Sequence, residues 1–80
     1  MINVSANIIV ERVEVQLDDN VPEYMDGIIR IGNVTVYFSN NTSKDHQELV
    51  DNEEFHTKEE MINRVAERLN LDKNLIEIIA

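Results

Sequence analysis

The sequence has no cysteine and no tryptophan, and only one proline and two glycines occur among its 80 residues. Without cysteine, disulfide bonds, thiolate metal sites and a cysteine nucleophile are excluded. Basic residues are also scarce, because seven lysines and arginines stand against sixteen aspartates and glutamates, for a formal net charge of -9. Nucleic-acid binding needs clustered basic side chains that displace counterions. Direct binding to DNA, RNA or an anionic membrane is therefore disfavoured, and a basic protein is the expected partner.

Long apolar runs are absent too, since none approaches the roughly 18 residues that a membrane-spanning helix needs. The opening residues, MINVSANIIVERVEVQL, lack the basic start and the small-residue cleavage motif of a signal peptide. The composition, 42% hydrophobic and 29% charged, is typical of a globular chain. We therefore expect residues 1–80 to form a single cytoplasmic domain.

The stretch DGIIRIGNVTVYFSN, residues 26–40, gives the clearest local signal. Two runs with high β-propensity flank Gly32-Asn33, and glycine followed by asparagine is typical of a type II′ hairpin turn. The sequence therefore predicts a β-hairpin that turns at Gly32. Its register would bury one face, made of Ile29, Ile31, Val34, Val36 and Phe38. The opposite face would carry Ile28, Arg30, Thr35 and Tyr37.

A further strand is expected upstream, where Val13, Val15 and Leu17 alternate with polar residues. The run Ile8-Ile9-Val10 breaks this alternation and predicts a bulge or a bend. Residues 18–25 would connect this strand to the hairpin, with Pro22 in a turn.

The stretch TKEEMINRVAERLN predicts a helix over residues 58–69. Thr57 and Glu60 match a capping box, and Asn70 suits a left-handed C-terminal stop. An apolar stripe at helical spacing comprises Met61, Ile62, Val65, Ala66 and Leu69. The tail, residues 75–79, favours a strand by its isoleucines, and a short helix capped by Asp72 is the alternative.

These elements give the order β-β-β-α-β. The sequence thus predicts an α+β domain in which a small antiparallel or mixed sheet packs one main helix on one face. The seventeen-residue connection from Asn40 to His56 is long for a compact domain, and loops of this length tend to be functional or disordered. Alternatively, Ser43 would cap a short helix within it.

Few features of the sequence indicate a catalytic or a metal-binding site. His46 and His56 lie ten residues apart and match no familiar zinc spacing. No serine lies in a G-x-S-x-G elbow, and the two glycines form no phosphate loop. We therefore expect a non-catalytic protein with no metal and no cofactor.

The stretch DHQELVDNEEFHTKEE, residues 45–60, concentrates acidic side chains. Electrostatic complementarity to a basic protein would use six of them, namely Asp45, Glu48, Asp51, Glu53, Glu54 and Glu59. The simpler interpretation is that these carboxylates only keep the protein soluble. Self-association through edge strands or through the face of Ile28, Arg30 and Tyr37 is the structural alternative.

In size, acidity and lack of cysteine, though in no motif, the chain resembles the small inhibitors that phages and mobile elements direct against nucleic-acid-binding host proteins, anti-CRISPR proteins among them. The resemblance implies an inhibitor, or a DNA mimic, whose carboxylates imitate phosphates.

Overall fold

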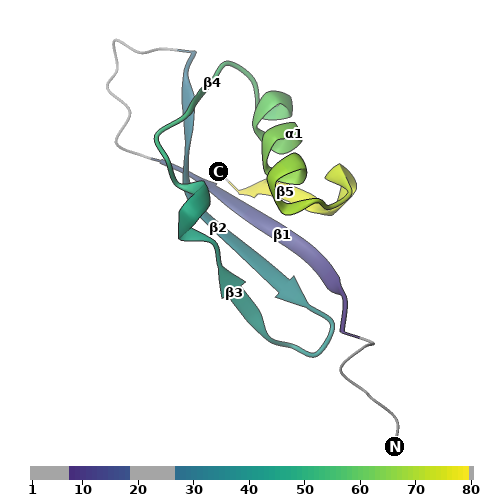
Figure 1. The fold of residues 1–80 in the computed structure, drawn as a ribbon. Coiled ribbons are helices and arrows are strands. Elements are labelled where there is room, and N and C mark those ends of the chain that lie inside the picture. Colours follow the sequence, from purple (N-terminus) through teal and green to yellow (C-terminus); the bar gives the residue numbers. More distant parts are fainter. Residues whose placement is uncertain (1–7, 19–26, 80) are drawn as a thin grey trace, which may run out of the picture.

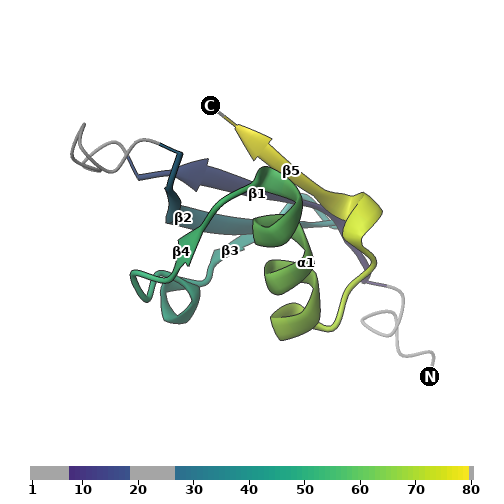
Figure 2. The same cartoon turned by 90° about the horizontal axis from the view of Figure 1, so that it is seen from above.

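The computed structural model describes residues 8–18 and 27–79. Their elements, in chain order, are β1 (Val10–Leu17), β2 (Ile29–Phe38), β3 (Ser43–Asp45), the 3-10 helix η3 (Gln47–Leu49), β4 (Glu54–Phe55), α1 (Lys58–Leu69), the 3-10 helix η4 (Lys73–Leu75) and β5 (Ile76–Ile79). Four strands lie in the order β3-β2-β1-β5, and β4 pairs with the other end of β2. Helix α1 lies across one face of this mixed sheet (Figure 1; Figure 2). The predicted α+β fold class is confirmed.

The predicted hairpin turn at Gly32 is wrong, because β2 runs without interruption from Ile29 to Phe38 and pairs antiparallel with β1. Gln16 pairs with Asn33 and Leu17 with Ile31, so Gly32 is the extra residue of a β-bulge. A Cβ at Gly32 would lie 3.0 Å from backbone atoms of Leu17. Glycine at this position therefore allows close approach to β1, and does not serve the positive φ of a turn.

The buried face predicted for this segment is nevertheless correct. Ile31, Val34 and Val36 are buried, and Ile29 and Phe38 pack against the core. A one-residue bulge shifts the alternation by one position, so Ile31 and Val34 point to the same side of the sheet. A two-residue turn would produce the same shift in the pattern.

A second bulge lies near the start of β1, where Val10 pairs with Phe38 and Arg12 with Tyr37. Glu11 is the extra residue, directly after the Ile8-Ile9-Val10 run that predicted the irregularity. Val13 and Val15 are buried and Leu17 is half-buried, as the alternation predicted. Residues 19–25 of the predicted connection between this strand and the next, including Pro22, lie outside the described residues.

Helix α1 has the predicted bounds and both predicted caps. The Thr57 hydroxyl accepts a hydrogen bond from the Glu60 backbone N–H, and the Glu60 carboxylate accepts one from the Thr57 N–H. Asn70 has φ 57°, and Leu71 donates to the Ala66 carbonyl, which closes a Schellman motif. The apolar stripe faces the sheet, with Met61, Val65 and Ala66 buried.

The segment between β2 and α1 is ordered by short elements. Ser43 begins strand β3 and not the helix considered for it, and one 3-10 turn buries Leu49. The strand preferred for the tail is confirmed, because Ile76–Ile79 form β5, parallel to β1. The Asp72 side chain caps only the short 3-10 turn η4, and not a helix that includes Ile78 and Ile79.

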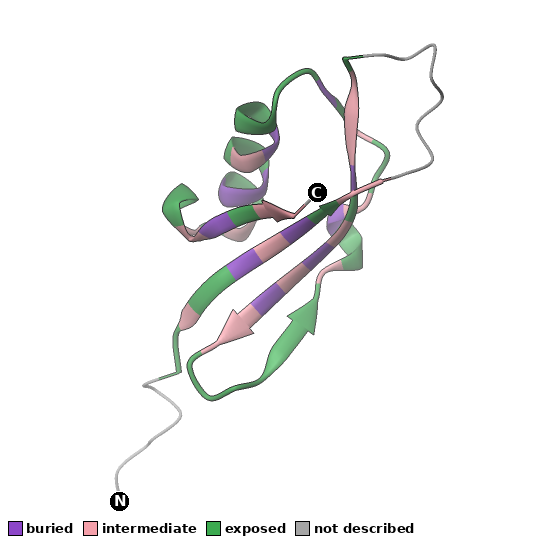
Figure 3. Cartoon of the chain, turned by 180° about the vertical axis from the view of Figure 1, so that it is seen from behind, coloured by how far each residue is buried: buried purple, intermediate pink, exposed green. Residues whose placement is uncertain are grey.

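The core lies between α1 and one face of the sheet, and Figure 3 shows buried residues alternating with more exposed ones along β1 and β2. Its buried members are Val13, Val15, Ile31, Val34, Val36, Leu49, Phe55, Met61, Val65, Ala66 and Ile76. None of the helices in residues 8–18 and 27–79 has the length and hydrophobicity of a membrane-spanning helix.

Candidate functional site: an acidic groove beside α1

The six carboxylates predicted to bind a partner do not share one surface. Asp45 lies on β3 and accepts a hydrogen bond of 2.9 Å from the Thr35 hydroxyl. Thr35 lies between buried Val34 and Val36, so its side chain points to the sheet face opposite α1. Glu54 lies on strand β4, and Glu53 directly precedes it. Glu59 is exposed in the first turn of α1.

Four of the six are engaged by basic side chains of the chain itself. The oxygen-to-nitrogen distances run from 2.6 to 2.9 Å, for Glu48 with His46, Asp51 with Arg68, Glu53 with Arg64 and Glu54 with Arg30. Such exposed pairs contribute little to the stability of a fold, because solvent screens them. The three arginine pairs offset part of the negative charge that the sequence concentrates at residues 45–60.

Two of these carboxyl groups titrate below their ordinary range. The hydrogen bond to the His46 ring lowers the pKa of Glu48. The backbone N–H of Glu53, followed by the Arg68 guanidinium, lowers the pKa of Asp51. Both groups are thereby held ionised in the fold.

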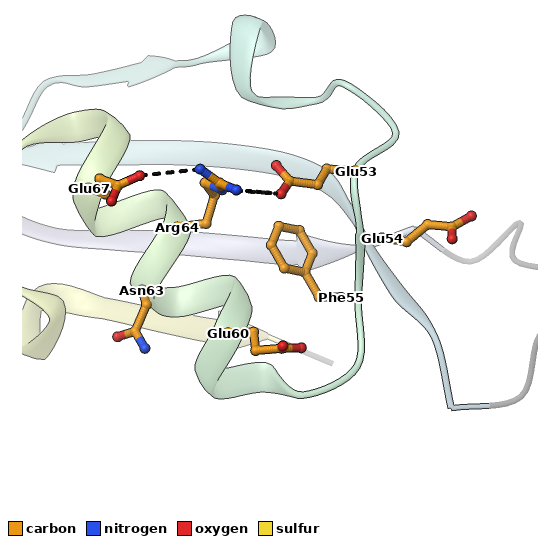
Figure 4. Close-up of a pocket in the computed structure, with 7 residues that line it drawn as sticks. All are labelled: Glu53, Glu54, Phe55, Glu60, Asn63, Arg64 and Glu67. Carbon is orange, nitrogen blue, oxygen red and sulfur yellow. Dashed lines mark hydrogen bonds and ion pairs between the residues drawn. The ribbon is translucent and has the colours of Figure 1, made fainter.

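A groove open to solvent, of about 380 Å³, lies between α1 and the chain at Glu53–Phe55. Figure 4 shows its lining side chains, with Arg64 between Glu53 and Glu67, while Glu54 points outward. The lining residues are Glu53, Glu54, Phe55, Glu60, Asn63, Arg64 and Glu67. Two of the six predicted residues, Glu53 and Glu54, are therefore brought together, and four are not.

The electrostatics of this acidic groove follow from its ion pairs. Arg64 lies 2.9 Å from Glu53 and 3.2 Å from Glu67, and Arg30 pairs with Glu54 from β2. Four carboxylates against these two guanidinium groups leave two negative charges in excess. One Glu60 oxygen accepts hydrogen bonds from the backbone N–H groups of His56 and Thr57, which holds this carboxylate at the N-terminus of α1.

Sequence reasoning missed the α1 wall of the acidic groove. Glu60, Asn63, Arg64 and Glu67 recur at three- and four-residue spacing, which places them on one side of a helix. That spacing was available in the sequence. What it could not supply is that this side of α1 lies against residues 53–55.

The face of the sheet opposite α1 carries a second polar cluster. The Arg12 guanidinium lies 4.0 Å from the centre of the Tyr37 ring, and its Nε lies 3.1 Å from Glu14. A hydrogen bond to the Glu14 carboxylate, with a smaller contribution from desolvation, raises the pKa of Tyr37. Tyr37 is thus held by its neighbours on this face.

Among residues 8–18 and 27–79, no three histidine or acidic side chains are placed to hold a metal ion together. The structure defines a two-layer α+β domain whose helix borders an acidic groove. No protein-family model, no curated protein and no solved structure matches this chain.

Proposed function

We propose that this chain is a non-catalytic protein-binding domain that takes a basic segment of a partner protein into the acidic groove. The excess of carboxylates around one open groove is the observation that carries the proposal. A lysine or arginine of the partner would enter beside Glu60 and Glu67. The Arg64 guanidinium is 45% exposed, so it can move aside from Glu53 at little cost.

The charge of the whole chain supports the same kind of partner. At -9, the domain attracts a basic surface over a distance set by salt, which speeds association and disfavours acidic competitors. Because the groove residues make exposed and not buried ion pairs, exchanging them for a partner's cation requires little desolvation. Affinity should therefore depend strongly on ionic strength.

The finer proposal is an inhibitor or DNA mimic, of the phage or mobile-element type, that acts on a basic nucleic-acid-binding protein. Its carboxylates would stand where such a protein binds phosphates. A cytoplasmic location fits a chain without cysteine.

The test is a tagged capture from nuclease-treated lysate at low and high salt, identified by mass spectrometry. We expect a basic protein that is retained at 0.1 M salt and released near 1 M, where the screening length falls from about 10 Å to about 3 Å. Duplex DNA should compete if the mimic proposal is correct. Capture that is unaffected by salt or by DNA contradicts this proposal.

Substitutions test whether the acidic groove is the surface that binds the partner. Glu53→Gln with Glu67→Gln should weaken capture, because both carboxylates line the acidic groove. The matched control is Glu77→Lys, which changes the net charge by the same two units at an exposed position on β5. Equal loss in the groove variant and in this control would show that only net charge matters.

A further inference from the structure

One arginine of the chain itself lies in the acidic groove and contacts two of its carboxylates. Arg64 points one edge of its guanidinium at Glu53, with Nε at 3.1 Å and Nη2 at 2.9 Å from the same carboxylate oxygen. Its remaining nitrogen, Nη1, lies 3.2 Å from Glu67 (Figure 4). The groove therefore already holds one guanidinium group, between a carboxylate next to β4 and a carboxylate of α1.

The contacts of Arg64 are open to exchange. The Arg64 side chain is 45% exposed, and the side chains of Glu53 and Glu67 are 33% and 73% exposed. Exposed ion pairs of this kind hold weakly, because water screens both charges and the long side chain loses rotamer freedom. A guanidinium from another protein could remake the same contacts, while Arg64 would regain its freedom in solvent.

Lysine takes no part in the ion pairs of the described residues. Within residues 8–18 and 27–79, each pair of a lysine or arginine with a carboxylate is made by an arginine, and Lys44, Lys58 and Lys73 make none. A guanidinium is planar and offers fixed donors, whereas an ammonium is a compact charge on a flexible stem. Because the contacts in the groove run to both Glu53 and Glu67, an arginine fits this place better than a lysine.

We propose that Arg64 is a stand-in for an arginine of the partner, and that in the free protein it occupies the place between Glu53 and Glu67 which the partner's guanidinium takes in the complex. This inference rests on the proposed function and narrows it, because the basic segment must then carry arginine and not only lysine. Arg64 is also an internal competitor. Binding displaces it into solvent, so the affinity of the acidic groove is lower than its carboxylates alone would give.

Isothermal titration calorimetry with two short peptides tests the preference for arginine. One peptide alternates glycine with arginine, and the other carries lysine in place of each arginine. At about 0.1 M salt, where the screening length is about 10 Å, we expect the native chain to bind the arginine peptide about threefold more tightly than the lysine peptide. Glu53→Gln with Glu67→Gln should abolish this preference, because both acceptors of the guanidinium lose their charge.

Substitutions of Arg64 test the competition. Arg64→Gln should tighten binding of the arginine peptide about threefold, within the range expected for release of one exposed ion pair. The circular dichroism spectrum should not change, because this side chain is exposed. Lys73→Gln removes the same charge from an exposed position outside the groove and is the control for net charge. Arg64→Lys keeps the charge but lacks the planar guanidinium, so it should also tighten binding, by a smaller factor.

The outcomes separate this inference from the proposed function. Equal affinity for the two peptides overturns the stand-in role alone, as does a gain with Arg64→Gln no larger than the gain with Lys73→Gln. Weaker binding by Arg64→Gln would mean that Arg64 assists the partner directly, which also overturns it. If neither the native chain nor Arg64→Gln binds either peptide, the acidic groove does not take basic segments and both proposals fail.

Discussion

Arg68, in the last turn of α1, reaches Asp51 in the loop before β4, with Nη1 and Oδ2 2.8 Å apart. Its other terminal nitrogen donates to the Glu48 carbonyl at 3.3 Å. One side chain thereby ties the end of the helix to the segment that follows β3. The same loop leads into the acidic groove, so this tie also positions Glu53.

The Asp51 tie predicts a specific acid sensitivity. A carboxyl group whose pKa is lowered in the fold stabilises it above the unfolded pKa, here 3.8, and this contribution is lost as pH falls through the lowered value. We therefore expect Asp51→Asn to reduce stability at neutral pH and to flatten its decline below about pH 5. Urea unfolding at a series of pH values measures this, with Glu77→Gln as the charge-matched control. Parallel curves for Asp51→Asn and the native chain would contradict the role given to Asp51.

The bulge at Gly32 predicts a steric effect. Gly32→Ala should destabilise the fold by about 1–3 kcal/mol, because the added methyl group would lie 3.0 Å from the Leu17 backbone. Gln16→Ala, at an exposed position of the adjacent strand, should change stability by no more than about 0.5 kcal/mol. Chemical denaturation gives both values. A neutral Gly32→Ala would mean that β1 and β2 do not approach as closely as described.

The N-terminal cap of α1 should be measurable on its own. Thr57→Ala removes the acceptor of the Glu60 N–H and should lower the free energy of unfolding by about 1 kcal/mol. Thr57→Ser keeps a hydroxyl and should recover most of that loss. If alanine and serine behave alike in thermal unfolding, the capping hydrogen bond contributes nothing.

At the C-terminal end of α1, two substitutions of the same residue should differ in their effect on stability. Asn70 has a left-handed backbone, with φ 57°. Asn70→Gly should stabilise the chain or leave it unchanged, whereas Asn70→Ala should destabilise it by about 1 kcal/mol, because a Cβ without a polar side chain disfavours this conformation. The midpoints of urea unfolding should therefore rank glycine above alanine.

Tyr37 provides a prediction at high pH. The Glu14 hydrogen bond raises the pKa of this phenol above 10.0, so the protonated ring stabilises the fold, and that contribution is lost as pH rises above 10.0 through the raised value. Glu14→Ala should bring the pKa of Tyr37 back toward its ordinary range. Ultraviolet titration of tyrosinate in a Tyr24→Phe background measures this. An unchanged midpoint would show that Glu14 does not hold the phenol.

The sequence alone determined the features that depend on neighbours within one or two turns. The capping box of Thr57 and Glu60, the stop at Asn70 and the buried stripe of α1 all follow from side chains three to five residues apart. The faces of β1 and β2 follow from alternation, which burial enforces on any strand. These signals are local, and tertiary packing did not alter them.

Only the tertiary structure decided between a turn and a bulge at Gly32, since both shift the apolar alternation by one residue. The outcome depends on β1, whose Leu17 is fifteen residues away and lies against Gly32. The tertiary structure likewise decided which arginine meets which carboxylate, because Arg30 and Glu54 are 24 residues apart and Arg68 and Asp51 are 17 apart. Charge counting gave an acidic stretch at residues 45–60. Contacts between distant segments divided that stretch among ion pairs, the open sheet face and one groove.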